Sequence, residues 1–283
     1  MPSAEQVILG YNNQVDSIRA KVVLFAKTVW LGSDQWRDAD VDRLVAQIVP
    51  RVQAGQIQIA NLTSAYIAAM AQVVDKQVIA PIPVDREEIT GARGVDPYEV
   101  YRRPAVQMYT ALSKGISFSD ALSQSVNRLT GLVSTDTQLA RTHQERASYP
   151  ASGYRYTIRT LTGKENCGLC VIASTQRYNA IDLRPIHPGC DCGSRQISAN
   201  FDPGQIIDAK LLEDTHAEIE RHLGATDRGA RDLGLSKTVL YAEGERAADF
   251  TDLIVTNEHS ELGPVLSWRS DQFTSAADIA ALS

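Results

Sequence analysis

The residues best suited to chemistry are four cysteines and a histidine within a span of 26 residues. They lie in Cys167-Gly-Leu-Cys170 and in His187-Pro-Gly-Cys190-Asp-Cys192, which together contain every cysteine of the chain. Zinc takes four thiolate or imidazole ligands at tetrahedral corners, and a Cys-x-x-Cys turn supplies two of them. His187 and Cys190 repeat the two-residue gap and can supply the other pair. The spacing therefore predicts one zinc site.

Five candidate ligands compete for four corners, and the sequence leaves the choice open. Either Cys190 or Cys192 is a spare residue, or His187 supports four thiolate ligands from outside the coordination sphere. Because the protein can fill all four corners, no position remains for a water molecule. We therefore expect a structural zinc site and no catalysis at the metal.

Two other uses of the cysteines compete with zinc binding. Disulfides are typical of secreted chains, and the first residues lack the basic and apolar stretches of a secretory signal. A redox Cys-x-x-Cys motif is expected at a strand-to-helix junction of a βαβ unit, a pattern that Cys167 and Cys170 lack. The sequence therefore favours zinc in a chain that stays in the cytoplasm where it is made.

The segments on both sides of the cysteines must position them. Residues 154–160 alternate and are rich in β-forming types, which predicts a strand before the cysteines. Residues 194–198 are expected to form a returning strand after them. A helix over about 134–147 precedes the first strand. The cysteines are thus expected to connect two strands.

Most of the first 150 residues have helical periodicity. Apolar side chains recur every three or four positions in the first thirty residues, which predicts one helix. The stripe consists of Ala4, Ile8, Tyr11, Val15, Ile18, Val22, Phe25 and Val29. We favour packing on helices of the same chain over docking to a partner, because the flanking charge pattern of a coiled coil is weak. A second helix is expected over 38–53, with Pro50 kinking or shortening it and Gly55 separating it from a third.

Prolines and caps suggest how the remaining chain is divided. Pro81 and Pro83 end the first helical block, and Asp96 caps a further helix that closes at Gly115. Ser117 or Ser119 opens the next helix, which runs through about residue 129. We predict a helical N-terminal block at 1–80, a linker at 81–95, a zinc-containing domain at 96–200 and a mixed segment at 201–283. In the last segment, 206–223 resembles a helix, 238–241 and 253–256 resemble strands, and 263–264 resemble a turn.

The composition excludes several classes of protein. The net charge of −6 argues against wholesale coating of DNA, and no long uninterrupted apolar stretch suggests a membrane span. Arg93, with Arg102 and Arg103, is expected in a solvated loop and helix end more readily than in a binding patch. Arg141, His143, Glu145 and Arg146 are expected on a charged helix surface more readily than in a site. The predicted fold class is mainly α with a small α+β zinc-stapled module.

The segment 138–192 resembles the MuF-like phage head morphogenesis (minor capsid) proteins. Leu139-Ala140-Arg141-Thr142 on a helix, a tyrosine-rich strand, and the two cysteine motifs follow the order of that family's domain. Asp191 stands where relatives often carry arginine. The specific part of the resemblance covers about residues 100–200, which would then form a MuF-like core. A weaker likeness, to MuF-like proteins of phages that infect actinobacteria, covers 258–266.

The resemblance implies a virion component that sits inside the capsid near the portal after assembly in the host cytoplasm. Its implied partners are the portal, scaffold and major capsid proteins, without a membrane and without sequence-specific nucleic acid binding. The helical N-terminal block is expected to dock partners, and its first helix also offers a route to self-association. A capsid maturation protease is an alternative, but no nucleophile with a positioned base stands out. A toxin-like effector released with the DNA is another, although the segment after Asn200 is short.

Overall fold

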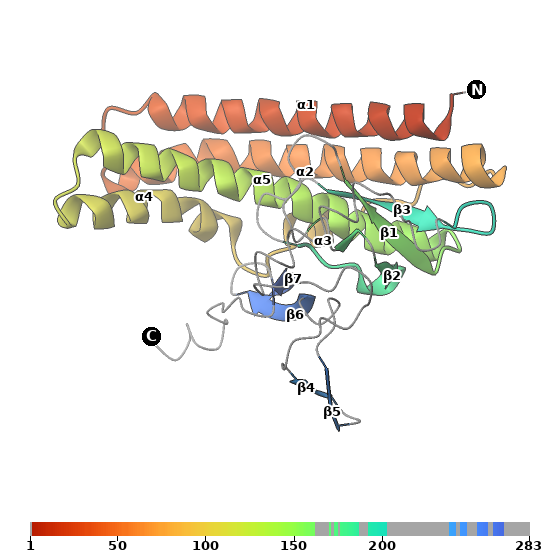
Figure 1. Cartoon of the computed structure of the whole chain (residues 1–283). Helices are drawn as coiled ribbons and strands as arrows, with labels where there is room; N and C mark the ends of the chain where they lie inside the picture. The colour runs from red at the N-terminus through yellow and green to blue at the C-terminus, as the bar shows by residue number, and fades with distance from the viewer. Residues whose placement is uncertain are drawn as a thin grey trace. The chain divides into compact units, whose positions relative to one another are not determined.

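The computed structural model describes residues 2–161, 170, 173–174, 176–186 and 192–202, and four strands between 238 and 268 (Figure 1). The side chains of those four strands are described only at Val265 and Ser267. The chain folds into two compact units. Described residues up to Tyr154 belong to the first unit, and those from Arg155 onward belong to the second. We describe each unit by itself.

The first unit is helical, as the predicted fold class requires. Its described residues form α1 (Ala4–Leu31), α2 (Asp38–Asp75), α3 (Arg86–Thr90), α4 (Pro97–Ser113) and α5 (Phe118–Ala151). Helices α1, α2 and α5 lie side by side along much of their length, and α4 runs along the first part of α5 (Figure 1). The short α3 packs against α2 and α5.

The core of this unit is formed by apolar side chains from α1, α2, α4 and α5. Trp30 of α1 is completely buried, and its indole Nε1–H donates a hydrogen bond to Ser125 Oγ of α5 at 2.9 Å. The indole ring also contacts Trp36, with 5.3 Å between ring centroids. The largest buried cluster contains Val22, Ala26, Trp30, Val41, Leu44, Val45, Ile48, Val49, Val52, Val100, Tyr101, Ala105, Val126, Leu129, Leu132 and Val133.

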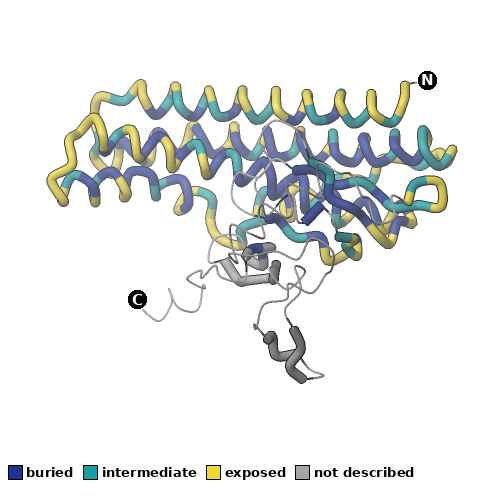
Figure 2. The backbone as a smooth tube through the Cα atoms, viewed as in Figure 1, coloured by how far each residue is buried: buried dark blue, intermediate teal, exposed yellow. Residues whose placement is uncertain are grey.

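The apolar stripe predicted for the first helix faces inward at Tyr11, Val15 and Val22, which are buried. Near the end of the helix the buried residues are Ala26 and Trp30, whereas the predicted Phe25 and Val29 are only partly buried. The stripe therefore packs on helices of the same chain. The outward side of α1 is exposed along the helix (Figure 2) and includes Leu9, Leu24 and Leu31, each more than half exposed.

The expected break between a second and a third helix is wrong. Helix α2 begins at Asp38 and continues without a break through Pro50 and Gly55 to Asp75. Pro50 removes one backbone hydrogen bond at a cost of about 3 kcal/mol, but Ile48, Val49 and Val52 are buried around it. Each buried side chain of this size contributes about 1.5–3 kcal/mol, which offsets the loss.

The glycine in α2 serves close packing. A Cβ at Gly55 would lie 2.7 Å from Cγ2 of Val22 on α1. The absence of a side chain therefore lets α1 and α2 approach each other at this point. Sequence reasoning assigned Gly55 to a break because it considered backbone freedom alone.

The two helices expected between residues 117 and 147 are one helix. Helix α5 runs without interruption from Phe118 to Ala151, capped by the Ser117 hydroxyl, which accepts a hydrogen bond from Asp120 N. Thr135, Asp136 and Thr137 favour helices weakly, but all three are buried. Tertiary contacts hold this stretch in the helix.

The segment 81–95 packs within the helical unit. Ile89 of α3 is buried against Ala60 of α2 and Ala140 of α5. The Ser64 hydroxyl donates to the carbonyl of Ile82 at 2.7 Å, and Gln56 Nε2 donates to the carbonyl of Ile89 at 3.3 Å. The compact units divide after Tyr154 instead of within this segment.

The second unit contains a small antiparallel sheet that confirms the two strands expected around the cysteines. Strand β1 (Tyr156–Thr160) lies between β2 (Arg177–Asn179) and β3 (Gly193–Ile197). A 3-10 turn, Ala180–Asp182, follows β2. Along the central strand, Thr157 lies opposite Tyr178 of β2 and Gln196 of β3.

Two further antiparallel pairs complete the described residues. Strand β4 (Thr238–Tyr241) pairs with β5 (Gly244–Ala247), and β6 (Ile254–His259) pairs with β7 (Gly263–Trp268). These pairs confirm the strands expected at 238–241 and 253–256. The turn expected at 263–264 is wrong, because both residues pair within β7 opposite His259 and Glu258. The helix expected over 206–223 lies outside the described residues.

Helix α2 has the length and apolar composition of a membrane-spanning helix. The central helix of a bundle has the same features, and α2 contributes six residues to the largest buried cluster: Val41, Leu44, Val45, Ile48, Val49 and Val52. Ile59, Ile67 and Met70 are buried further along the helix. Composition alone therefore does not distinguish these two roles.

Alanine substitutions at two helical glycines test the close approach of α1 and α2. Gly55→Ala should destabilise the protein by about 1–2 kcal/mol, because the stiff Val22 side chain cannot move away freely. Gly131→Ala on α5 is the matched control, because a Cβ there meets nothing within 4 Å. It should stabilise the protein by about 0.5–1 kcal/mol. Urea denaturation measures both, and a stabilising Gly55→Ala would contradict the close approach.

Candidate functional site

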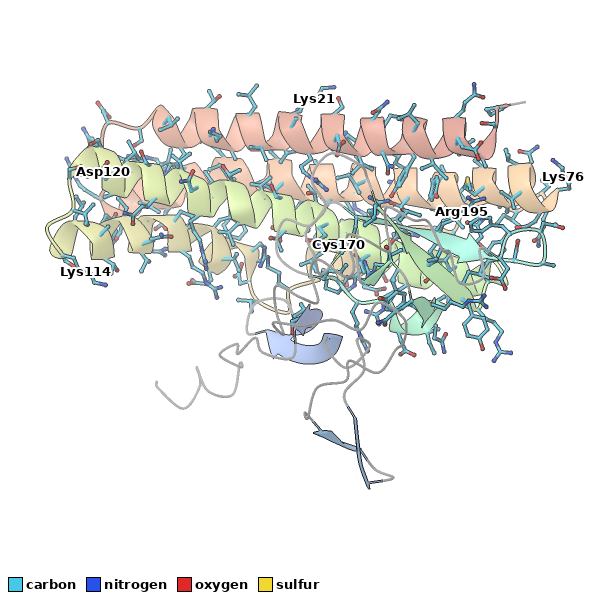
Figure 3. The ribbon with its side chains drawn as sticks, in the orientation of Figure 1. Lys21, Lys76, Lys114, Asp120, Cys170 and Arg195 are labelled. Carbon is cyan, nitrogen blue, oxygen red and sulfur yellow. The ribbon has the colours of Figure 1, made fainter. Side chains whose placement is uncertain are left out.

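Two of the five predicted metal ligands, Cys170 and Cys192, lie in the described part of the chain. Both are buried in the second unit, at 3% and 8% exposure, and they are not bonded to each other (Cys170 is labelled in Figure 3). Cys170 lies in a helical turn, and its backbone carbonyl accepts a hydrogen bond from the backbone N–H of Ser174 at 2.9 Å. Cys192 comes directly before β3. Cys167, His187 and Cys190 lie outside the described residues.

Arg159 of β1 connects the sheet to Cys192. Its Nη1 donates a hydrogen bond to Cys192 Sγ at 3.8 Å, and its Nη2 donates to the carbonyl of Arg184. The guanidinium also lies over the ring of Tyr178, 5.4 Å from the centroid. A cation that donates to sulfur favours the thiolate, which is the form that binds a metal. Sequence reasoning missed Arg159, although its inward position follows from the two-residue alternation with Thr157.

Tyr178 provides a second link to both described cysteines. Its hydroxyl donates to the carbonyl of Ala173 at 2.8 Å. Burial raises the pKa of Tyr178 to about 12, Arg159 opposes this change, and Cys192 and Cys170 add to it. Tyr178 also lies under the Arg159 guanidinium, which donates to Cys192.

Within the described ranges, no group of three or more His, Cys, Asp or Glu side chains is arranged to hold a metal ion. Three of the five predicted ligands, Cys167, His187 and Cys190, lie outside these ranges and are not covered by this observation. The predicted zinc site, formed from Cys167, Cys170, His187, Cys190 and Cys192, therefore stays a prediction. Cys170 and Cys192 fit such a site because both are buried, and Cys192 also accepts a hydrogen bond from Arg159.

The helical unit holds a buried ion pair that sequence reasoning did not find. The Arg93 side chain pairs with Asp136 of α5, and each side chain is only 7% exposed. The other Asp136 oxygen accepts from the Tyr101 hydroxyl at 2.7 Å. The expectation of a solvated loop is wrong for Arg93. Arg102 fits it better, because its partly exposed side chain pairs with Asp42 at 3.2 Å.

A second buried cluster lies between α1, α2 and α5. The Tyr11 hydroxyl hydrogen-bonds to Thr63 at 2.8 Å, and its ring stacks on Tyr66 with centroids 4.2 Å apart. The Arg141 guanidinium lies 4.8 Å from the centroid of the Tyr11 ring and donates to Glu145 at 3.2 Å. The stacked rings of Tyr11 and Tyr66 and the Arg141–Glu145 ion pair therefore form one buried cluster.

The prediction that Arg141, His143, Glu145 and Arg146 lie on a charged helix surface is wrong for Arg141 and Glu145. Arg141 and Glu145 are 5% and 2% exposed. His143 is the more accessible group, and its Nδ1 lies 3.6 Å from Glu88 of α3. The sequence could not distinguish a buried pair from a surface pair, because both have the same i, i+4 spacing.

Comparison with protein-family models, curated proteins and solved structures finds no match to this chain.

The buried Tyr11 predicts a loss of stability in alkali. Desolvation raises its pKa from 10 to about 12, so the folded state holds the phenolic proton more tightly than the unfolded state does. Stability from this group is complete below about pH 10 and falls as pH rises toward 12, by up to about 3 kcal/mol. Tyr11→Phe should cost about 1 kcal/mol at neutral pH through the lost hydrogen bond and should weaken the alkaline decline.

Urea midpoints measured from neutral pH to about pH 11 test this prediction. Tyr98→Phe, at an exposed ring on α4, is the matched control and should leave stability unchanged. An alkaline decline of the same steepness in Tyr11→Phe and in the original chain would contradict the assignment.

Proposed function

We propose that this chain is a MuF-like minor head protein of a tailed bacteriophage, with a structural zinc site. In this role it binds the portal and scaffold proteins during procapsid assembly and is packaged in the head. The observation that carries the proposal is the cysteine segment, in which Cys170 and Cys192 are buried and Cys192 accepts a hydrogen bond from Arg159. The order helix, strand, Cys-x-x-Cys and His-Pro-x-Cys-x-Cys is the one the family resemblance rests on.

The zinc ion would have a structural task. The described sheet is small, with strands of five, three and five residues. Such a sheet buries little apolar area, so a metal bound by four side chains would add a large share of its stability. Arg159 would orient Cys192 from outside the coordination sphere by donating to its sulfur.

The exposed face of α1 is a suitable surface for a portal or scaffold protein. Leu24 and Leu31 are 66% and 52% exposed, and their spacing of seven residues places them on one side of the helix. Exposed apolar side chains on a long helix are suited to helix packing with a partner. The inward face of α1 is occupied by the core, so docking would use this outer face and leave the bundle intact.

Metal analysis of the purified full chain tests the zinc site. We expect about one zinc per chain, and loss of both zinc and thermal stability in Cys170→Ser. Ala180→Ser is the control for damage to the interior of the same unit, because Ala180 is fully buried but is not a predicted ligand. It should lower stability and keep the zinc. A metal-free chain with full stability would refute the zinc site.

Pull-down with the portal protein tests the docking surface. Deleting residues 1–80 would remove α1 and α2 and with them most of the core, so point substitutions are preferable. The double variant Leu24→Glu and Leu31→Glu should fold normally and lose portal binding. Lys21→Glu, at an exposed residue of the same helix (Figure 3), controls for the added charge. Full binding by the folded double variant would rule out this surface.

A further inference from the structure

The three-stranded sheet of the second unit has one face made of polar side chains, most of which are buried. Thr157 and Arg159 alternate on β1, and Gln196 and Ser194 lie directly opposite them on β3. Tyr178 of β2 lies opposite Thr157 on its other side. Directly paired residues of antiparallel strands project to the same face of the sheet. We call these five residues the polar face.

The polar face is buried to an unusual degree for its chemistry. Thr157 and Gln196 have no exposed area, and Ser194 and Arg159 are at most 5% exposed. Threonine, glutamine and arginine are mostly found at protein surfaces, and they are seldom fully buried without partners. An apolar face would be the ordinary way to bury one side of a small sheet. Its replacement by polar groups indicates that these groups have a partner to bind.

Some of these groups have no partner among the described residues. The Thr157 hydroxyl and both polar atoms of the Gln196 amide are buried without a hydrogen bond. Each such buried group costs about 1–3 kcal/mol. Native proteins pair more than about nine in ten of their buried polar groups. Unpaired groups on adjacent strands, beside the Arg159 guanidinium, mark a place where hydrogen bonds are available to a ligand.

The donors and acceptors of the polar face limit the class of ligand. The guanidinium of Arg159 brings a positive charge, and the Gln196 amide N–H group and the Thr157 hydroxyl can donate. An oxoanion satisfies these groups, because it has several acceptor oxygens and a negative charge. The Gln196 amide oxygen needs a donor in return. A phosphate that keeps one proton provides that donor, whereas sulfate has none at neutral pH.

We propose that the polar face binds a protonated oxoanion, namely inorganic phosphate or the phosphate of a monoester. Arg159 supplies the charge, Thr157 donates to a phosphate oxygen, and the Gln196 amide both donates to the anion and accepts from its hydroxyl group. Thr157 and Gln196 are fully buried, so a hydrogen bond to either side chain is stronger than it would be in water. This binding is distinct from portal docking, but it shares Arg159 with the predicted zinc site, because Arg159 also donates to Cys192 Sγ.

Direct binding to the full chain is the first test. Protein purified without phosphate is incubated overnight and then dialysed to equilibrium with labelled inorganic phosphate, because an enclosed site exchanges slowly. We expect about one phosphate per chain. In thermal denaturation at matched ionic strength, phosphate should raise Tm by about 3 °C more than sulfate does. Glycerol phosphate in a third arm, compared with inorganic phosphate at about pH 6 where a monoester keeps its proton in about half of the molecules, distinguishes a site for monoesters from a site for free phosphate.

Isosteric variants show whether the polar face is the site. Thr157→Val removes the hydroxyl at nearly constant volume and should abolish the phosphate-specific rise in Tm without lowering Tm in phosphate-free buffer. Gln196→Met is the second variant, in case the first folds poorly, and should lose phosphate in the same way. Arg177→Gln on β2 is the control, because Arg177 is half exposed and pairs with Asp202. It removes a cation from the same sheet and should keep phosphate binding.

Three results would overturn the proposal. The first is dialysis that finds no bound phosphate, and the second is an equal rise of Tm in phosphate and sulfate, which marks a general salt effect. The third is a Thr157→Val variant that binds phosphate normally or is several degrees less stable in phosphate-free buffer, since the hydroxyl would then have a partner within the protein. Zinc content is measured in every variant, so that loss of the metal is not mistaken for loss of the anion site.

Discussion

The helical unit depends on the burial of polar side chains along the second half of α5. Asp136, Arg141 and Glu145 are shielded from water, and a buried charge without a partner costs several kcal/mol. Asp136 meets Arg93 and Tyr101, which come from the α3–α4 connection and from α4. Arg141 meets Glu145 and the ring of Tyr11 on α1. The Arg141–Glu145 pair forms within α5, but the contacts of Asp136 with Arg93 and Tyr101 and of Arg141 with the Tyr11 ring need one particular register of the helices.

Apolar packing alone would fix that register less strictly. Aliphatic side chains tolerate small shifts and repacking, whereas a buried ion pair loses its stabilisation when one partner moves by a few ångströms. Gly55 adds a steric condition, because α1 and α2 approach each other closely at Val22. The bundle therefore combines a permissive apolar core at one end with a more demanding polar core along α5. Its outer surface on α1 carries the exposed side chains of Leu9, Leu24 and Leu31.

The second unit also buries polar side chains, and it has fewer residues to stabilise them. Its sheet buries the polar side chains of Thr157, Arg159 and Gln196, and Arg159 donates to Cys192 at the edge of the cysteine segment. A small sheet has little apolar area with which to offset this burial. Bound ligands can offset this cost. The zinc ion and the oxoanion proposed for this unit would each bind polar or thiol groups that are buried in the described part of the chain.

The sequence by itself determined local features: the helical period of α1, the cap at Asp96, whose carboxylate accepts from Tyr98 N, and the strands on both sides of the cysteines. These follow from side-chain period and from hydrogen bonds between near neighbours, which the sequence states directly. The tertiary structure decided the continuity of α2 through Pro50 and of α5 through Asp136, and it decided that Arg93, Arg141 and Glu145 are buried. A local penalty of a few kcal/mol is offset by burial against residues far away in the chain, and only folding brings those residues together.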